Sequence, residues 1–355
     1  MSSNNPTVPV RDGEELNISA VDVLIKAKRP DIKSMPKVTQ YSSGASNLTY
    51  AVDYEEQRYV LRRPPFGYIP KGGHDMNREY RIQTALQPAY PYVPKTLLYT
   101  DDDSHIGAEF YLMERTEGHL IHTDIPLEWG WGASEASKLN ETFVQRLIDL
   151  HKVDYKAIGL GDFGKPDGYV DRQVFGWNKR FTKAWTEDIE KFEDVCQWLE
   201  DNRPDGEQGV GLLHGDFRID NCILDLDDPT QIKAILDWEI SALGDPLMDL
   251  GNTLSYWIQA DDPDFMKLMI RQPCAAPGMM TRQEFLDFYT AQIPLDQSKF
   301  QFYYVYGIWR LAVIVQQIYF RYYHKQTDNP KFKSYGMMSD ALGKLARLKI
   351  NSGKL

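Results

Sequence analysis

The chain has few cysteines: its 355 residues include only Cys196, Cys222 and Cys274, and no two of them form a CxxC spacing. Scattered thiols of this kind predict neither a disulfide framework nor a thiolate zinc site. His119 and His122 also lack a third partner at ligand spacing, so we assign no zinc. This cysteine usage fits a reducing compartment, and we expect a cytoplasmic protein.

Basic charge is in short supply as well. The formal net charge is −11 at pH 7, whereas a nucleic-acid surface normally has a net basic footprint. The N-terminus has no basic start followed by an apolar run, so we expect no secretory signal. The most apolar helix candidate, 302–323, is interrupted by glycine, arginine and glutamine, and it lacks the uncharged span that a bilayer crossing requires. We therefore expect neither nucleic acid nor membrane as a partner.

What the sequence does contain is a globular composition, 42% hydrophobic and 26% charged, and a length that suits two domains or lobes. Residues 1–34 have the pattern of a polar tail and a helix capped by Asn17. Residues 35–115 are mostly extended, and residues 116–355 are largely helical. The sequence therefore predicts an α+β protein with a strand-rich N-terminal lobe and a larger helical C-terminal lobe.

The expected elements follow from hydrophobic periodicity and turn residues. In the first lobe we predict helices at 18–28 and 75–86 and strands at 38–42, 48–53, 57–63, 96–100 and 109–114. In the second lobe we predict a helical face from Ala136 to Leu150, a helix at 189–199, short strands at 211–213, 222–225 and 233–237, and mostly helix thereafter, with a break near 272–278.

The most informative segment is LLHGDFRIDNCILDLDDPTQIKAILDWEISALGDPLMDL, from Leu212 to Leu250. It places Asp216 five residues before Asn221, and Asp237 at the end of an apolar strand. Mg²⁺ prefers hard oxygen ligands that it shares with substrate phosphates, and phosphoryl transfer needs an acid group that aligns the attacking hydroxyl. The alternative is two turns whose Asp and Asn side chains bond their own backbone. The spacing and the flanking strands favour a site for a magnesium nucleotide beside a hydroxyl.

HGDFRIDN, followed by ILDWE and GDPLMDL, resembles the aminoglycoside phosphotransferase and choline kinase-like superfamily, which is related to the protein kinases. The resemblance extends over roughly 35–324. It implies a protein kinase-like α+β fold with a small antiparallel-sheet N-lobe at 35–115 and a larger, mostly helical C-lobe at 116–355. It implies ATP and Mg²⁺ as cofactors, Asp216 as the catalytic base or hydroxyl-orienting group, and Asn221 and Asp237 as magnesium ligands.

Three further residues of this segment take roles from the resemblance. Arg218 lies where many protein kinases have a lysine that faces the transferred phosphate, so it is a catalytic candidate that neutralises developing charge; a surface salt bridge is the equal alternative. His214 precedes Asp216 by two positions and is expected to shape the loop rather than to transfer protons. Asp249 is expected to bond the backbone of the catalytic loop and so to support its geometry.

The strand YVLRR matches the position of the nucleotide-binding lysine of kinases. Alternation puts Val60 and Arg62 on one face, where Val60 would floor the adenine pocket and Arg62 would bind the phosphates. This departs from the superfamily, in which lysine is usual, although arginine also pairs with phosphate. Arg63 is the alternative register. Glu79 resembles the helix glutamate that pairs with that strand cation, and an exposed glutamate on a charged helix is the alternative.

Two other segments are candidates for contact with the nucleotide. SSGAS lies between two strands, where kinases place their phosphate-covering loop, so Ser43, Gly44 and Ser46 could contact phosphate; a plain hairpin turn is the alternative. In FYLMERTEG, Glu114 and Thr116 lie where the hinge between the lobes would offer backbone groups to adenine. We expect the active cleft near this junction.

Asp162-Phe163-Gly164 spells the metal motif of protein kinases, but it precedes Asp216, and the metal-binding aspartate must follow the base loop. We interpret it as a loop that could line the acceptor pocket. Trp177, Trp257 or Tyr306 could line that pocket as well.

We therefore predict a phosphotransferase that uses Mg·ATP to phosphorylate a hydroxyl group of a small molecule. Protein substrates are less expected because GDPLMDL follows Asp237 without room for an activation segment. LDWE, GLGDFGKP and GDPLMDLG resemble the kinase-like domains fused to certain acyl-CoA dehydrogenases, which implies a hydroxyacyl-CoA or hydroxy acid as acceptor. The alternatives are an aminoglycoside phosphotransferase and, because of Arg62, a catalytically inactive module that binds a nucleotide or metabolite; hydrolysis ranks far behind.

Overall fold

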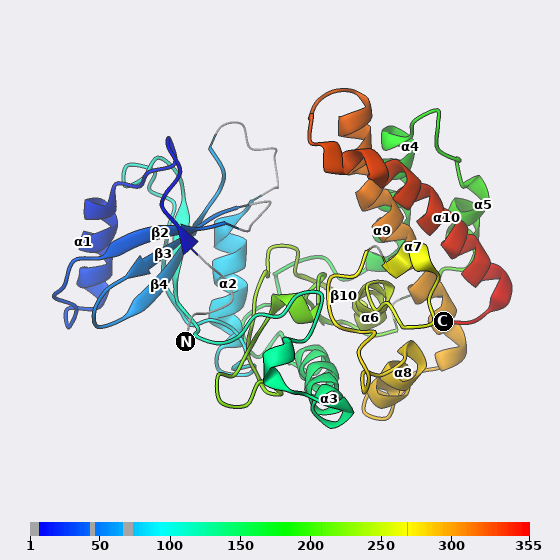
Figure 1. Ribbon diagram of the computed structural model, residues 1–355, viewed down its shortest axis with the longest axis horizontal. Coiled ribbons are helices and arrows are strands. Elements are labelled where there is room, and N and C mark those ends of the chain that lie inside the picture. Colours follow the sequence, from blue (N-terminus) through cyan, green and yellow to red (C-terminus); the bar gives the residue numbers. More distant parts are fainter. Residues whose placement is uncertain (1–6, 43–46, 67–73, 207, 268) are drawn as a thin grey trace. The chain divides into compact units, whose positions relative to one another are not determined.

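The computed structural model describes residues 7–42, 47–66, 74–206, 208–267 and 269–355 (Figure 1). By their contacts the residues form two compact units. The first unit comprises Met1–Ile121, Lys156–Leu160 and Asn221–Ser241, and the second comprises His122–Tyr155, Gly161–Asp220 and Ala242–Leu355. The predicted division at 35–115 and 116–355 follows sequence order alone and stays a prediction.

The first unit contains the predicted small antiparallel sheet. Its order is β1-β2-β3-β4-β6-β5, and each neighbouring pair is antiparallel. The strands are β1 (Thr7–Val8), β2 (Lys37–Tyr41), β3 (Leu48–Asp53), β4 (Arg58–Arg63), β5 (Thr96–Thr100) and β6 (Phe110–Glu114). The prediction of an extended N-terminal region is thus confirmed.

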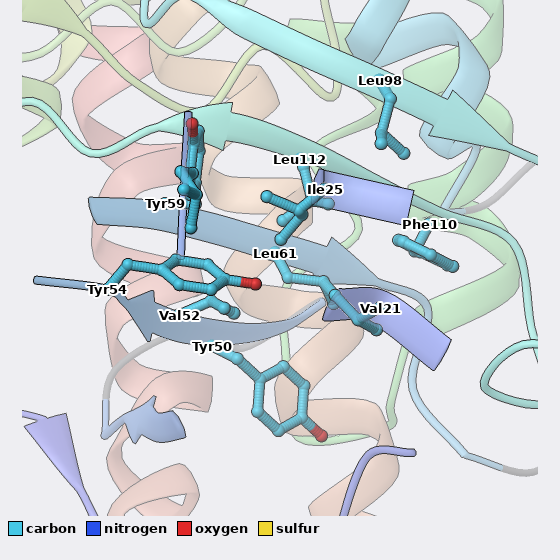
Figure 2. Close-up of a cluster of buried hydrophobic side chains, with 11 residues drawn as sticks. Val21, Ile25, Tyr50, Val52, Tyr54, Tyr59, Leu61, Leu98, Phe110 and Leu112 are labelled. Atoms are coloured by element: carbon cyan, nitrogen blue, oxygen red, sulfur yellow. The ribbon is translucent and has the colours of Figure 1, made fainter. Parts of the chain in front are cut away.

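Two helices cover opposite faces of this sheet (Figure 1). Helix α1 (Ile18–Lys28) is capped by Asn17, whose side chain accepts a hydrogen bond from the N–H of Ala20, as the cap prediction requires. Its residues Val21 and Ile25 pack against Leu61 and neighbouring aromatic residues in a buried cluster (Figure 2). Helix α2 (Met76–Leu86) packs on the other face, where Met76 joins Val60 and two residues of β6.

A second antiparallel pair in the first unit consists of β8 (Cys222–Leu224) and β9 (Ile232–Ile235), and two of the predicted site residues, Asn221 and Asp237, lie just beyond one end of it. A bridge to His119 fixes the hairpin, and Gly118 is required there because a Cβ at this position would lie 2.2 Å from the carbonyl oxygen of Leu224. Both strands are shorter than predicted.

The second unit is mostly helical, as predicted. Its helices are α3 (Ala133–His151), α4 (Tyr169–Ala184), α5 (Glu193–Asp201), α6 (Pro246–Ser255), α7 (Asp264–Lys267), α8 (Arg282–Thr290), α9 (Phe300–Tyr323) and α10 (Tyr335–Ser352). This unit also contains a short antiparallel pair, β7 (Gly211–Leu213) with β10 (Ala242–Gly244). Helix α5 begins at Glu193 rather than at the predicted residue 189, because Phe192 has a left-handed backbone with φ of 47°.

The backbones of helices α6 and α9 are in close contact at two glycines, Gly251 and Gly307. A Cβ on Gly251 would lie 2.2 Å from the carbonyl oxygen of Tyr303, and a Cβ on Gly307 would lie 2.2 Å from that of Gly251. Any side chain at either position would push the helices apart, so this contact fixes α6 against α9. In the described part of the chain no helix is both long enough and apolar enough to cross a membrane.

Candidate active site

The β8–β9 hairpin places Asn221 and Asp237 at the same end. Cys222 pairs with Ile235 in the antiparallel register, so the residue before β8 and the residues after β9 emerge together. The N–H of Leu236 donates to the carbonyl oxygen of Asn221 at 2.8 Å, which closes this end of the hairpin. Asp237 has φ of 68°, a left-handed conformation that aspartate and asparagine tolerate better than most residues.

Arg62 joins this hairpin end to helix α2. Its Nη1 forms an ion pair with Oε1 of Glu79, and its Nη2 lies 3.7 Å from Oδ1 of Asp237. Val60 lies on the same face of β4, as the alternation predicted. Arg63 lies on the other face, where its side chain donates to the carbonyl oxygens of Pro64 and Ile106. The structure therefore brings Arg62, rather than Arg63, to Glu79.

The Arg62–Glu79 pair is buried, and its electrostatics follow from that. Glu79 is 0% exposed, so burial raises the pKa of its carboxyl to about 7, although the attraction of Arg62 opposes the rise. Burial also disfavours the charged guanidinium, but the carboxylates of Glu79 and Asp237 more than compensate and raise the pKa of Arg62. Arg62 is therefore a fixed positive charge beside the carboxylate of Asp237.

The hairpin end fits a magnesium ion. Oδ1 of Asp237 is buried and accepts no hydrogen bond from the described residues, although Arg62 lies 3.7 Å away and a buried carboxylate oxygen without a hydrogen bond is costly. Within the described ranges, no cluster of three or more His, Cys, Asp or Glu side chains forms a metal cage. Mg²⁺ does not require one, because it keeps several waters and binds one or two carboxylates together with substrate phosphates. Asp237 and Asn221 would supply the protein oxygens.

Sequence reasoning missed a network next to this hairpin end. The buried side chain of Asn47 donates from Nδ2 to Oε2 of Glu239 at 3.1 Å, and its Oδ1 lies 2.7 Å from Nδ1 of His74. Asn47 and His74 immediately follow the two segments 43–46 and 67–73, and Glu239 follows Asp237 by two residues. The WE of ILDWE was the available signal, since a charged residue after a buried Trp238 needs a partner.

In the second unit, the loop after β7 carries Asp216 and is held by backbone hydrogen bonds to one carboxylate. The N–H groups of His214 and Gly215 donate to Oδ2 and Oδ1 of Asp249, both at 2.8 Å. The N–H of Asp216 donates to Nδ1 of His214 at 3.2 Å. Gly215 has φ of +86°, which favours glycine. This geometry agrees with loop-shaping roles for His214 and Asp249.

Asp249 is itself anchored by residues that the sequence did not reveal. Its Oδ2 lies 3.2 Å from Nε2 of His151, and Nδ1 of His151 lies 2.7 Å from the hydroxyl of Tyr289. Burial alone would raise the pKa of Asp249, but the hydrogen bond to His151 and the electrostatic influence of His151 and His214 lower it. Asp249 therefore stays ionised, and its two oxygens hold the loop as charge-assisted acceptors.

Arg218 contacts the candidate base directly. Its Nη2 lies 3.4 Å from Oδ2 of Asp216, its Nε lies 3.1 Å from Oδ1 of Asp220, and its guanidinium lies 5.0 Å from the ring centre of Tyr256. Burial raises the pKa of Asp220, whereas Arg218 opposes that rise. Arg218 is thus shared between two carboxylates rather than placed in an exposed surface pair.

The sequence profile of the phosphotransferase enzyme family matches residues 37–285, more than half of the chain. The chain belongs to this family. Over 345 residues it is 32% identical to acyl-CoA dehydrogenase family member 10 of Mus musculus, an alignment that covers 96% of this chain and 32% of that protein. The chain therefore spans about a third of the length of this curated relative.

Solved structures place the fold. A provisionally named aminoglycoside phosphotransferase of Ralstonia eutropha matches with a TM-score of 0.81 at 26% identity, over 95% of this chain and 99% of that one. A choline kinase of Cryptosporidium parvum matches with a TM-score of 0.61 at 12% identity, over 94% and 97% of the two chains. The protein kinase-like α+β fold and the predicted resemblance are confirmed.

The remaining candidates for contact with the nucleotide are Ser43, Gly44, Ser46, Glu114 and Thr116. Ser43, Gly44 and Ser46 lie outside the described residues. Glu114 ends β6, where its N–H donates to the carbonyl oxygen of Lys95, and Thr116 follows in the connecting segment. Their nucleotide-binding roles stay predictions.

The candidates for the acceptor pocket lie in three different surroundings. Trp257 is fully buried, its ring stacks on Phe143, and its Nε1 donates to the carbonyl oxygen of Met280, so it belongs to the core. Phe163 is buried, whereas Asp162 is exposed in a turn. Trp177 and Tyr306 lie together on α4 and α9, where the ring nitrogen and the hydroxyl share Gln173 as acceptor.

The substitution Asp249→Asn should destabilise the protein by about 2–4 kcal/mol at pH 7, because it leaves buried donors facing a neutral amide. The lowered pKa of Asp249 sets the pH dependence. Its contribution is present above the pKa of an unfolded aspartate, near ~3.9, and is lost as the pH falls through the folded-state pKa. Urea unfolding of wild type and variant from pH 7 to pH 3 should show a gap that narrows with acid; a constant gap would contradict this account.

Proposed function

We propose that this member of the phosphotransferase family is a small-molecule kinase that transfers the γ-phosphoryl group of ATP to a hydroxyl group. The observation that carries the proposal is the arrangement around Arg62, whose guanidinium pairs with buried Glu79 and lies 3.7 Å from Oδ1 of Asp237. A magnesium nucleotide requires a fixed cation for its phosphates and a carboxylate oxygen for its metal ion, and Arg62 and Oδ1 of Asp237 provide these two groups. Asp216, which contacts Arg218, would be the group that orients the acceptor hydroxyl.

In the proposed reaction, Asp216 aligns the acceptor hydroxyl and takes its proton as the oxygen attacks the γ-phosphorus. The bond to the β–γ bridging oxygen breaks, and ADP leaves. Arg62, held by Glu79, binds the phosphates, and Arg218 neutralises charge that develops on the transferred group. Bound magnesium would supply further neutralisation across the phosphates, with Asn221 and Asp237 as its protein ligands.

For the acceptor we propose a hydroxylated acyl-CoA or hydroxy acid. The support is the 32% identity, over nearly the whole chain, to a protein that is named as an acyl-CoA dehydrogenase family member. An aminoglycoside is the alternative, supported by the name of the structural neighbour from Ralstonia eutropha. Magnesium-dependent ADP release over hydroxyacyl-CoAs, hydroxy acids, aminoglycosides, choline and sugars tests both. Absence of ADP release with every acceptor would reject the proposal.

The second candidate function is a module that binds a nucleotide or metabolite without turnover, and the observation that prompts it is Arg62 in the place of the usual lysine. The substitution pair Arg62→Lys and Arg62→Gln distinguishes the two functions. We expect Arg62→Gln to lower kcat/KM for ATP by at least about tenfold, since a charged contact to phosphate is lost. We expect Arg62→Lys to retain most of the activity, although one ammonium replaces a fork that reaches both Glu79 and Asp237.

Steady-state ADP release at varied ATP concentrations measures both variants, and Arg63→Gln, on the opposite face of β4, is the control for general damage to the strand. If all three variants and the wild type bind ATP with equal affinity and none releases ADP, the non-catalytic module is the better account.

A further inference from the structure

The second unit contains a buried cation whose role the reaction described above does not explain. Arg310 on α9 is 8% exposed, and its guanidinium lies 5.3 Å from the centre of the Trp177 ring. Arg180, three residues after Trp177 on α4, is exposed and lies 4.4 Å from the same ring. One indole ring therefore contacts two guanidinium groups.

The two helices hold this indole in a fixed position. Gln173 and Trp177 are four residues apart on α4, and Tyr306 and Arg310 are four residues apart on α9, so each pair lies on one helical face. Oε1 of Gln173 accepts from Nε1 of Trp177 at 3.1 Å and from the hydroxyl of Tyr306 at 3.3 Å. The guanidinium of Arg310 therefore lies beside the Trp177 ring, and the hydrogen bond to Gln173 fixes the orientation of that ring.

Neither guanidinium has a carboxylate partner: among the residues that the structure describes, none forms an ion pair with Arg310 or Arg180. A second buried arginine of the same unit shows the usual arrangement, since Arg282, 2% exposed, pairs with Asp262 at 2.6 Å. A buried charge without a partner is costly. Arg310 is therefore a buried cation that an anionic ligand would stabilise.

The loop that carries Asp216 influences the charge of Arg310. Burial alone would lower the pKa of Arg310, but the neighbouring groups of Tyr256, Tyr306 and Asp216 raise it, so the guanidinium stays charged. Tyr256 also contacts Arg218, whose Nη2 lies 3.4 Å from Asp216. Tyr256 therefore lies close both to Arg310 and to the Arg218–Asp216 pair.

We infer that Arg310, assisted by Arg180 and the Trp177 ring, binds an anionic group of the acceptor, so that the enzyme selects hydroxylated anions over neutral or cationic alcohols. The inference rests on the proposed function in that Asp216 takes the proton of the acceptor. Arginine forms paired hydrogen bonds with carboxylate and with phosphate, and the indole offers an apolar wall to a carbon chain. An ammonium group would be repelled by both arginines.

The test is a comparison of acids with their matched carboxamides. ADP release is measured with hydroxy acids whose hydroxyl lies two to six carbons from the carboxylate, with the corresponding carboxamides, and with the coenzyme A thioesters. For wild type we expect higher kcat/KM with the anionic acceptors. The variant Arg310→Gln should reduce the preference of anion over carboxamide by about a hundredfold, because truncating one partner of a buried charge pair costs several kcal/mol. A preference that is unchanged for both the free acids and the thioesters would overturn the inference.

The two sources of negative charge separate within the same experiment. If the carboxylate is bound, Arg310→Gln lowers kcat/KM for the free acid and spares the thioester, which lacks that charge. If a phosphate of coenzyme A is bound, the loss falls on the thioester. Equal losses with acid, thioester and carboxamide would assign Arg310 to structural packing alone and overturn the inference.

Two further variants guard against misfolding. Arg310→Lys keeps the charge without the fork and should recover part of the preference, whereas Arg180→Gln, on the exposed side, should reduce it roughly two- to fivefold. Binding without chemistry gives an independent readout: an acid that lacks the hydroxyl, or its coenzyme A thioester, should raise the unfolding temperature of wild type and not that of Arg310→Gln. If this shift appears while no acceptor releases ADP, the anion site stands and the proposed function fails. If ADP release occurs without any preference for anions, the function stands and the anion site fails.

Discussion

The substitution Asp216→Asn should lower kcat by about 10²–10⁴-fold while the affinity for ATP changes little. Asparagine preserves the size of the side chain and its backbone hydrogen bond to His214, but it cannot accept the proton of the acceptor. The groups proposed to bind the magnesium nucleotide are Arg62, Asn221 and Asp237, and none of them is changed. The loss should therefore appear in turnover rather than in the KM for ATP. Single-turnover measurement of ADP release at saturating ATP and acceptor tests this expectation.

Asp220→Asn is the matched control. Asp220 also pairs with Arg218, at 3.1 Å compared with 3.4 Å for Asp216, so both substitutions disturb the same guanidinium. Only Asp216 is proposed to take a proton, and Asp220→Asn should therefore cost less than about tenfold, below the loss expected when a general base is removed. Equal losses in both variants would mean that Asp216 acts only by holding Arg218, and a variant Asp216→Asn with near wild-type turnover would exclude it as the base.

The sheet of the first unit could be predicted because its information is local. In β4, alternation placed Val60 and Arg62 on one face and Leu61 on the other, and the two buried clusters of the first unit divide in the same way. Helix α1 could be bounded because its Asn17 cap is readable in sequence. A pattern of period two leaves little freedom once one face is buried, and this is why Arg62 could be chosen over Arg63.

The rest of the site depends on contacts between residues far apart in the chain, which periodicity does not encode. His151 and Asp249 are 98 positions apart, and Asn47 and Glu239 are 192 positions apart. A histidine near the end of a helix and a glutamate after a buried tryptophan look ordinary in sequence. The start of α5 was misjudged for a related reason, since the left-handed φ of Phe192 is a conformation that a bulky residue adopts only when tertiary packing requires it.

The substitution Asp237→Asn should raise the magnesium concentration needed for half-maximal activity and lower kcat by at least about a hundredfold. A bound metal ion contributes several kcal/mol of charge stabilisation, and each 1.36 kcal/mol corresponds to a factor of ten in rate. Asparagine is the suitable replacement because position 237 has φ of 68°, which asparagine tolerates, whereas alanine would add backbone strain. The loss can therefore be assigned to the carboxylate charge rather than to a distorted hairpin.

A magnesium titration of ADP release measures this effect, and Asp225→Asn is the control on the other end of the same hairpin. Asp225 accepts hydrogen bonds through Oδ1 from the N–H groups of Asp227 and Asp228, and asparagine can accept them equally well. We expect Asp225→Asn to follow the wild-type titration. Because Arg62 lies 3.7 Å from Asp237, removing the carboxylate also leaves Arg62 with Glu79 as its ion-pair partner, so binding of free ATP without magnesium should be equal or tighter in Asp237→Asn. Unchanged magnesium dependence in that variant would show that the ion is held elsewhere.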